Sequence, residues 1–183
     1  MNLFRIAAAV CMWGWAVVAA DPPAQPQEFK HRVTGLFSPD READLRAALE
    51  KIPDVKLVRV DFDHAEAFFD YDPAVAFKGT KPEKIVERFN DLLRGATRST
   101  MGIAPLDPTP KNQLTRLEIP VAILDCKACC LAAYESIYKI PGVAAATASF
   151  KEGRVTALID SNRTDRVAIE DTLKKRNVTL KKP

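Results

Sequence analysis

The chain has 183 residues, of which 47% are hydrophobic and 28% charged, so it is large and apolar enough to fold as one medium domain or two small ones. The formal net charge is only +3 and basic residues are spread among acidic ones, which excludes a basic nucleic-acid-binding stripe. The sequence shows no Ser-His-Asp set, no paired catalytic carboxylates and no phosphate loop, so we expect a protein that is not an enzyme.

The first twenty residues have the pattern of an export signal. One positive charge, at Arg5, precedes an uncharged run over residues 6–20 that ends in small residues before Asp21. We interpret residues 1–20 as a signal peptide and expect a periplasmic or secreted protein. An uncleaved anchor is the alternative, although the run is short of the roughly 20 residues that a membrane span needs. Residues 21–28 form a Pro-rich spacer.

The rest of the chain contains an internal repeat. Residues 50–55 (EKIPDV) resemble residues 138–143 (YKIPGV) at an offset of 88, which also superposes Leu36 on Leu124. A Pro-rich break over residues 102–112 separates the two copies. We therefore predict two domains that fold independently, over residues 29–104 and 114–183, joined by a linker over residues 105–113.

Each copy is predicted to run strand, helix, strand, strand, helix, strand, from the hydrophobic periodicity and the turn residues. In the first copy these elements cover residues 29–37, 40–51, 55–62, 67–71, 82–94 and 101–104. In the second copy they cover residues 117–124, 128–139, 143–150, 154–160, a helix capped by Thr164 with Val167, Ile169 and Leu173 on its apolar face, and 178–180. This order predicts an α+β fold of two tandem ferredoxin-like βαββαβ domains.

Three of the four cysteines cluster in one short segment, Cys126-Lys127-Ala128-Cys129-Cys130, between a predicted strand and a predicted helix. The fourth, Cys11, falls in the signal peptide. The number of cysteines in this segment is odd, and all three lie close together. They therefore do not form the disulfide framework of a secreted domain, in which paired cysteines are spread along the chain. Two thiols three residues apart at a helix start can hold one soft metal ion or form a disulfide with each other.

The second copy resembles the heavy-metal-associated (HMA) domain family of soft-metal chaperones, metal-pump domains and mercuric-ion-binding periplasmic proteins. Cys126 and Cys129 match the thiols of the family motif. The apolar residues that follow in the family are matched by Ala133, Ile137 and Ile140, and the segment that ends the helix is matched by Pro141-Gly142-Val143. The resemblance implies a ferredoxin-like fold, a soft metal ion as cargo, namely Cu(I), Zn(II), Cd(II) or Hg(II), and a partner that is a metal-transporting membrane protein or another HMA domain. Ile123 and Leu124 depart from the Gly-Met of the family.

The metal ligands expected from this resemblance are Cys126 and Cys129, with Asp125 and Cys130 as further candidates. A helix amino terminus should stabilise the thiolates and lower their pKa. Asp directly before the first cysteine resembles the zinc, cadmium and lead variant of the family, because a carboxylate suits Zn(II) and not Cu(I). Alternatively, Asp125 only caps the helix. Cys130 is either an inert half-buried residue or a third ligand.

The first copy has Ser38 and Arg41 at the places of the two thiols, so we interpret it as a degenerate HMA copy without a metal site. His31 and His64 are interpreted as ordinary surface histidines. The leading functional hypothesis is an exported carrier, buffer or sensor of soft metal ions. The alternatives are a protein-interaction scaffold with vestigial thiols and a thiol–disulfide oxidoreductase that uses Cys126 and Cys129.

Overall fold

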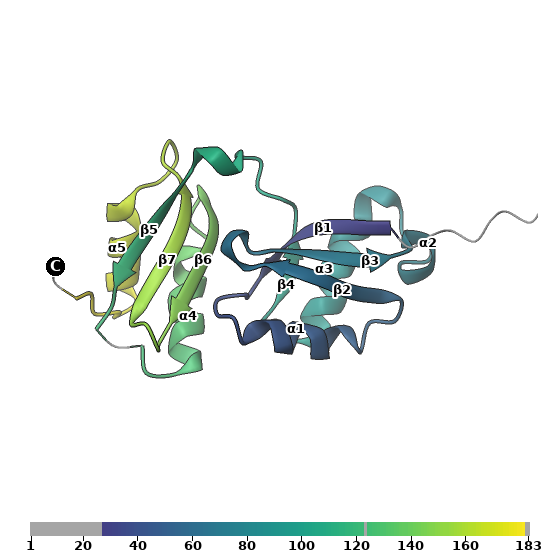
Figure 1. Cartoon of the computed structure of the whole chain (residues 1–183), viewed down its shortest axis with the longest axis horizontal. Helices are drawn as coiled ribbons and strands as arrows, with labels where there is room; N and C mark the ends of the chain where they lie inside the picture. The colour runs from purple at the N-terminus through teal and green to yellow at the C-terminus, as the bar shows by residue number, and fades with distance from the viewer. Residues whose placement is uncertain (1–26, 123, 182–183) are drawn as a thin grey trace, which may run out of the picture.

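The computed structural model describes residues 27–122 and 124–181 (Figure 1). The predicted signal peptide, most of the Pro-rich spacer and Ile123 lie outside these ranges. Among the described residues, no helix combines the length and the apolar content that crossing a membrane requires. The described chain forms two antiparallel sheets, each with its helices packed on one face, which we call the first unit (residues 27–104) and the second unit (residues 114–181).

The first unit has the βαββαβ order that the sequence predicts. Its elements are β1 (Gln27–Thr34), α1 (Arg41–Leu49), β2 (Val55–Asp61), β3 (Glu66–Tyr71), α3 (Ile85–Ala96) and β4 (Gly102–Ala104). The strands pair antiparallel in the order β2-β3-β1-β4, which is the ferredoxin-like order. An extra short helix, α2 (Pro73–Ala76), lies between β3 and α3.

The second unit repeats this arrangement with a shorter last strand. Its elements are β5 (Leu114–Pro120), α4 (Lys127–Ile137), β6 (Val143–Ser149), β7 (Arg154–Asp160) and α5 (Arg166–Lys175). The strand order is β5-β7-β6, and the strand predicted at residues 178–180 is reduced to one bridge between Leu180 and Val121. The bridge lies next to β5, so the chain returns to the place that the ferredoxin-like order requires.

Three details of the second unit differ from the sequence prediction. The helix α5 is capped by Asp165, whose carboxylate accepts from the Ala168 N–H at 2.8 Å, and not by Thr164, which is buried one residue earlier. Val167, predicted on the apolar face of this helix, is 62% exposed. The first strand runs over residues 114–120, so it starts and ends a few residues before the predicted range.

The repeat is visible in the two hydrophobic cores. Equivalent positions are buried in both units: Val33 and Val121 near the strand end, and Leu36 and Leu124 in the loop that follows. Each core lies between a sheet and its two helices. Burial at the same repeat positions explains why two segments with few identical residues form the same order of strands and helices.

The first unit packs against the edge strand β6 of the second. The Ala148 N–H donates to the Phe37 carbonyl at 2.9 Å, and the Arg32 guanidinium donates to the Val143 carbonyl at 3.0 Å. The Gly35 N–H donates to the Tyr134 hydroxyl at 2.8 Å. Phe37 itself is only 3% exposed and belongs to the hydrophobic core of the second unit. The two units therefore share a buried contact.

The predicted linker is attached to the first unit. The Lys111 ammonium lies 2.8 Å from the Glu66 carboxylate and 3.0 Å from that of Asp61. Glu66 is buried, and its carboxylate also pairs with Lys30 at 3.4 Å. A buried carboxylate is costly unless opposite charges or hydrogen bonds compensate it, and these two lysines supply that compensation to Glu66. The contacts of Lys111 also hold the linker against the first unit.

His31 is a buried residue and not the surface histidine expected from the sequence. It is 8% exposed, and its Nε2 lies 2.7 Å from the Tyr71 hydroxyl. Burial lowers the pKa of His31 from its ordinary value of 6.5. The native state therefore binds this proton less readily than the unfolded chain does.

We expect the unfolding free energy to fall as the pH drops below about 6.5, because the unfolded chain binds a proton at His31 more readily than the native state does. The slope for this one site is at most about 1.4 kcal/mol per pH unit. Urea unfolding between about pH 5 and pH 7.5 measures it. The His31→Gln variant, which keeps a neutral hydrogen-bonding group, should lose this part of the pH dependence, whereas an unchanged slope in that variant would assign it to other groups.

Candidate metal centre

The first turn of α4 places the candidate ligands. After β5 the chain reaches Cys126, which has extended backbone angles (φ −150°, ψ 161°) and is the N-cap of α4. Its sulfur accepts the Cys129 N–H at 3.2 Å. A thiol thus occupies the position that a Ser or Asp side chain usually takes at a helix start. Asp125 precedes the cap, so the interpretation of Asp125 as the helix cap is wrong.

The carboxylate of Asp125 is directed at the second thiol instead. The Cys129 S–H donates to Asp125 Oδ1 at 3.0 Å. One ligand atom each from Asp125, Cys126 and Cys129 lies within 4.8 Å of the other two. Asp125 and Cys126 are exposed and Cys129 is partly exposed, so an ion can reach all three. In the described ranges 27–122 and 124–181, no second group of three His, Cys, Asp or Glu side chains lies this close together.

The electrostatics of the thiol pair differ from the sequence expectation. Hydrogen bonds with the Cys126 side chain and then with the Asp125 carboxylate raise the pKa of Cys129 to about 12. The same thiol donor lowers the pKa of the Asp125 carboxyl. A carboxylate and a second sulfur beside Cys129 both disfavour its thiolate form. The thiolate is the form that binds a metal ion, so metal binding at Cys129 releases its proton.

Cys130 is separated from the other three candidates. It is 1% exposed and packs in the core of the second unit, and burial raises its pKa. Successive residues of a helix are rotated by about 100°, so Cys130 points away from the side on which Cys129 lies. A ligand role for Cys130 would require the first turn of α4 to unwind. Leu124, at the place of the family methionine, is buried and anchors the loop from inside.

The equivalent place in the first unit is filled by a guanidinium group. Arg41 stands at the repeat position of Cys129, and its Nε donates to the Gly35 carbonyl at 3.1 Å. Its Nη2 donates to the Thr100 hydroxyl at 3.1 Å, which ties the loop to the far end of the unit. Ser38, at the repeat position of Cys126, donates to Asp40. These contacts hold a guanidinium group at the repeat position of Cys129.

The first unit also contributes a side chain next to the thiol loop. The Lys127 ammonium, between the two cysteines in sequence, lies 2.5 Å from the Asp40 carboxylate. This ion pair raises the pKa of Lys127 and lowers that of Asp40. Both side chains are exposed, so the pair adds little to stability. Sequence reasoning missed Asp40, because no local signal places a first-unit residue beside Lys127.

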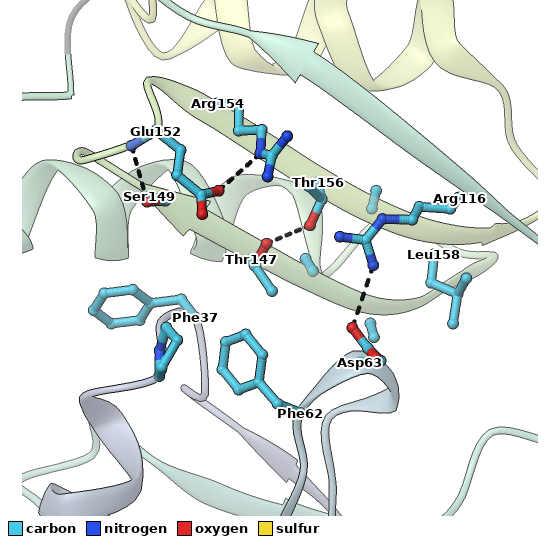
Figure 2. Close-up of a pocket in the computed structure, with 14 residues that line it drawn as sticks. Phe37, Phe62, Asp63, Arg116, Thr147, Ser149, Glu152, Arg154, Thr156 and Leu158 are labelled. Carbon is cyan, nitrogen blue, oxygen red and sulfur yellow. Dashed lines mark hydrogen bonds and ion pairs between the residues drawn. The ribbon is translucent and has the colours of Figure 1, made fainter.

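A small cavity of about 170 Å³ lies where the first unit meets the open face of the second sheet (Figure 2). Phe37 and Phe62 form its first-unit wall, and the Thr147 and Thr156 hydroxyls bond to each other on the sheet. Arg116 at its rim is paired with Asp63 at 3.3 Å. Its charged groups already have partners, so the cavity is a packing feature of the contact between the units.

His64 is likewise engaged within the protein. Its Nδ1 lies 2.9 Å from Asp61 Oδ2, and the same carboxylate pairs with Lys111. The acidic turn around Asp61 and Asp63 therefore binds cations of the protein itself: His64 when protonated, Lys111 and Arg116. These ion pairs account for the acidic residues of the turn.

Comparisons with known proteins give no family assignment. No protein-family model matches the chain, and no curated protein matches it. Oxidized MerP from Ralstonia metallidurans CH34 is 16% identical and covers 37% of this chain and 94% of its own, with a TM-score of 0.36. The N-terminal soluble domains of Bacillus subtilis CopA are 18% identical and cover 86% and 93%, with a TM-score of 0.35. The N-terminal domain of the zinc(II) ATPase ZiaA in its apo form is 27% identical and covers 38% and 99%, with a TM-score of 0.35. At such TM-scores the fold assignment rests on the strand order of the chain itself and not on these likenesses.

Proposed function

We propose that this protein is an exported soft-metal-ion binding protein, acting as a carrier, buffer or sensor through Cys126 and Cys129. The observation that supports the proposal most strongly is the convergence of Asp125, Cys126 and Cys129 within 4.8 Å at an exposed helix start. Thiolates bind soft and borderline metal ions in preference to Mg²⁺ or Ca²⁺. The proposal includes a signal peptide over residues 1–20 and a metal-transporting membrane protein or HMA-type domain as the partner that delivers or receives the ion.

The proposal places the metal site in the domain 114–183 and gives the domain 29–104 no soft-metal site of its own. Arg41 supports this division, because its guanidinium occupies the repeat position of Cys129 and bonds to two neighbouring segments. The contact of the first unit with β6 favours a supporting role for it. The scaffold alternative therefore applies to the first unit alone.

Asp125 bears on the choice of metal. Its carboxylate contacts Cys129 and does not cap α4, so its position is explained by the thiol site and not by helix capping. Two thiolates suffice for linear Cu(I) or Hg(II), whereas Zn(II) and Cd(II) take further ligands. We propose that Asp125 acts as a third ligand and favours Zn(II) or Cd(II), with water or a partner protein at the fourth position.

Replacing Asp125 with threonine tests this choice. If the carboxylate binds the ion, Asp125→Thr should weaken Cd(II) binding by about 10-fold or more, because an oxygen ligand is lost, and leave Cu(I) affinity nearly unchanged. Competitive titrations of the reduced chain with both ions give the ratio of the affinities. The helix start should keep its stability, since the cap is Cys126. An equal affinity ratio in the two proteins would reject Asp125 as a ligand and leave a two-thiolate site that favours copper.

A further inference from the structure

The start of α4 lies beside a segment of the first unit that is anchored in the second unit. The Gly35 N–H donates to the hydroxyl of Tyr134 on α4, and the Phe37 ring packs in the core of the second unit. The Phe37 carbonyl also accepts from the Ala148 N–H at 2.9 Å. The chain then enters α1, which begins on the side of the first unit that faces the second (Figure 1). These contacts fix the place of the start of α1 relative to the second unit.

The Asp40 carboxylate at the start of α1 is directed at the second unit. Asp40 stands at the N-cap position of α1, yet its side chain makes no capping bond there. It accepts from the Ser38 hydroxyl and pairs with the Lys127 ammonium, each at 2.5 Å. Asp44 and Arg41, which also act on Lys127 electrostatically, pair with each other. Asp40 is therefore the first-unit carboxylate that holds Lys127, and replacing it removes no helix cap.

Lys127 is placed where its charge can act on the proposed metal site. It is the first residue of α4, directly after Cys126 and two residues before Cys129. Its side chain is 65% exposed, and a lysine side chain is long and flexible. Without Asp40, its ammonium would be an uncompensated positive charge beside the two sulfurs.

The charge of the site changes differently when a monovalent or a divalent ion binds. Each of the two thiols loses its proton when it binds a metal ion, so the ligands gain two negative charges. A Cu(I) ion returns one positive charge and leaves the site more negative by one. A Zn(II) or Cd(II) ion returns two and leaves the charge of the site unchanged. An ammonium beside the site therefore favours Cu(I) over the divalent ions, and a carboxylate beside it has the opposite effect.

We propose that Asp40 is a specificity-determining residue of the metal site: by cancelling the charge of Lys127, it withholds from Cu(I) the compensation that an unpaired lysine would supply. This inference rests on the proposed function and gives the first unit a role in it. Asp125 favours divalent ions as a ligand. Asp40 acts on the same choice through Lys127, from outside the group of three ligand side chains.

Competitive titration of the reduced chain without residues 1–20 with Cu(I) and Cd(II) tests the proposal. Asp40→Asn leaves Lys127 unpaired and should raise the ratio of Cu(I) to Cd(II) affinity by about 3- to 10-fold, the effect of two unit charges about 6 Å apart near a protein surface. Lys127→Gln leaves Asp40 unpaired and should lower this ratio by a similar factor. The double variant carries neither charge and should have the ratio of the parent chain.

Two further variants separate charge from structure. Asp40→Glu keeps the carboxylate and should keep the parent ratio. Glu42→Gln makes the same change of charge on the exposed side of α1, where Glu42 pairs with Arg46, and should also leave the ratio unchanged. An ion pair with a merely structural role would move the ratio in one direction in both Asp40→Asn and Lys127→Gln, since both variants break the same contact.

Opposite shifts of the affinity ratio in the two single variants, cancelled in the double variant, support the proposal. A parent chain that binds both ions, with one ratio in all variants, overturns this inference and leaves the proposed function intact. Shifts of both single variants in the same direction have the same consequence. A parent chain that binds no soft metal ion contradicts the proposed function and this inference together.

Discussion

Replacing Cys126 or Cys129 with serine is expected to lower the affinity for Cd(II) or Cu(I) by about 100- to 1,000-fold. Structural sites with four ligands gain roughly 10–16 kcal/mol from the metal, so an equal share for one ligand is about 2.5–4 kcal/mol, which is about two to three factors of ten. Both sulfurs lie in the group of three side chains at the start of α4, and no other described side chain is placed to replace either of them. Titration under reducing conditions against a competing chelator measures the loss.

Cys130→Ser is the matched control for these variants. Its thiol is buried in the core and separated from the other two, so the change should alter the affinity by less than about 10-fold and act mainly on stability. If Cys130→Ser weakened binding as much as Cys126→Ser, the first turn of α4 would have to unwind around the ion. The site would then contain three thiols, in contrast to the structure, in which Cys130 is buried in the core.

Phe37→Ala is expected to destabilise the protein by about 3–5 kcal/mol, the usual cost of removing a buried phenylalanine side chain. Phe37 belongs to the first unit in sequence, yet its ring is 3% exposed in the core of the second unit, 5.9 Å from the Tyr134 ring. The truncation should therefore loosen the second unit and the contact between the units together. Thermal or urea unfolding of the chain without residues 1–20 provides the measurement.

Phe150→Ala provides the comparison, because Phe150 is 46% exposed and its loss should cost no more than about 1 kcal/mol. If Phe37→Ala were as mild as Phe150→Ala, the two units would fold independently, as we expected from the sequence. A large loss, with one cooperative transition in place of two, would show that the first unit stabilises the metal-binding unit.

Most of the fold could be predicted from the sequence because the chain repeats itself. The shared pattern around residues 50–55 and 138–143 ends a helix and starts a strand in both units, and Gly142 has the positive φ of 95° that this stop needs. Element order and strand pairing followed from that pattern. The errors lie at element ends, such as the cap of α5, where Thr164 and Asp165 are adjacent and both residue types cap helices well.

The sequence predicts the place of the two thiols in the fold and does not predict their electrostatics. The spacing of Cys126 and Cys129 placed both thiols at a helix start, as the structure has them. The pKa of Cys129 was expected to fall and instead rises to about 12, because the sequence does not show which neighbour each thiol contacts. The same limit applies to Asp125, because the sequence does not show that Cys126 caps α4 and that the Asp125 carboxylate contacts Cys129.

The contact between the units had no signal in the sequence. Phe37 was predicted as the end of a strand, where an apolar residue usually faces the core of its own domain. Lys111 was assigned to a linker, although its ammonium lies against two first-unit carboxylates. Both contacts join segments that are far apart in the chain, and periodicity describes only neighbours along a helix or strand.

Native mass spectrometry of the reduced chain without residues 1–20, offered Cu(I), Zn(II) and Hg(II) in competition, tests the central claim most directly. We expect one soft metal ion per chain and none in the Cys126→Ser, Cys129→Ser double variant. Cys130→Ser should still bind one ion. An unchanged metal load in the double variant, or no bound ion in the unaltered chain, would contradict a metal site at the start of α4.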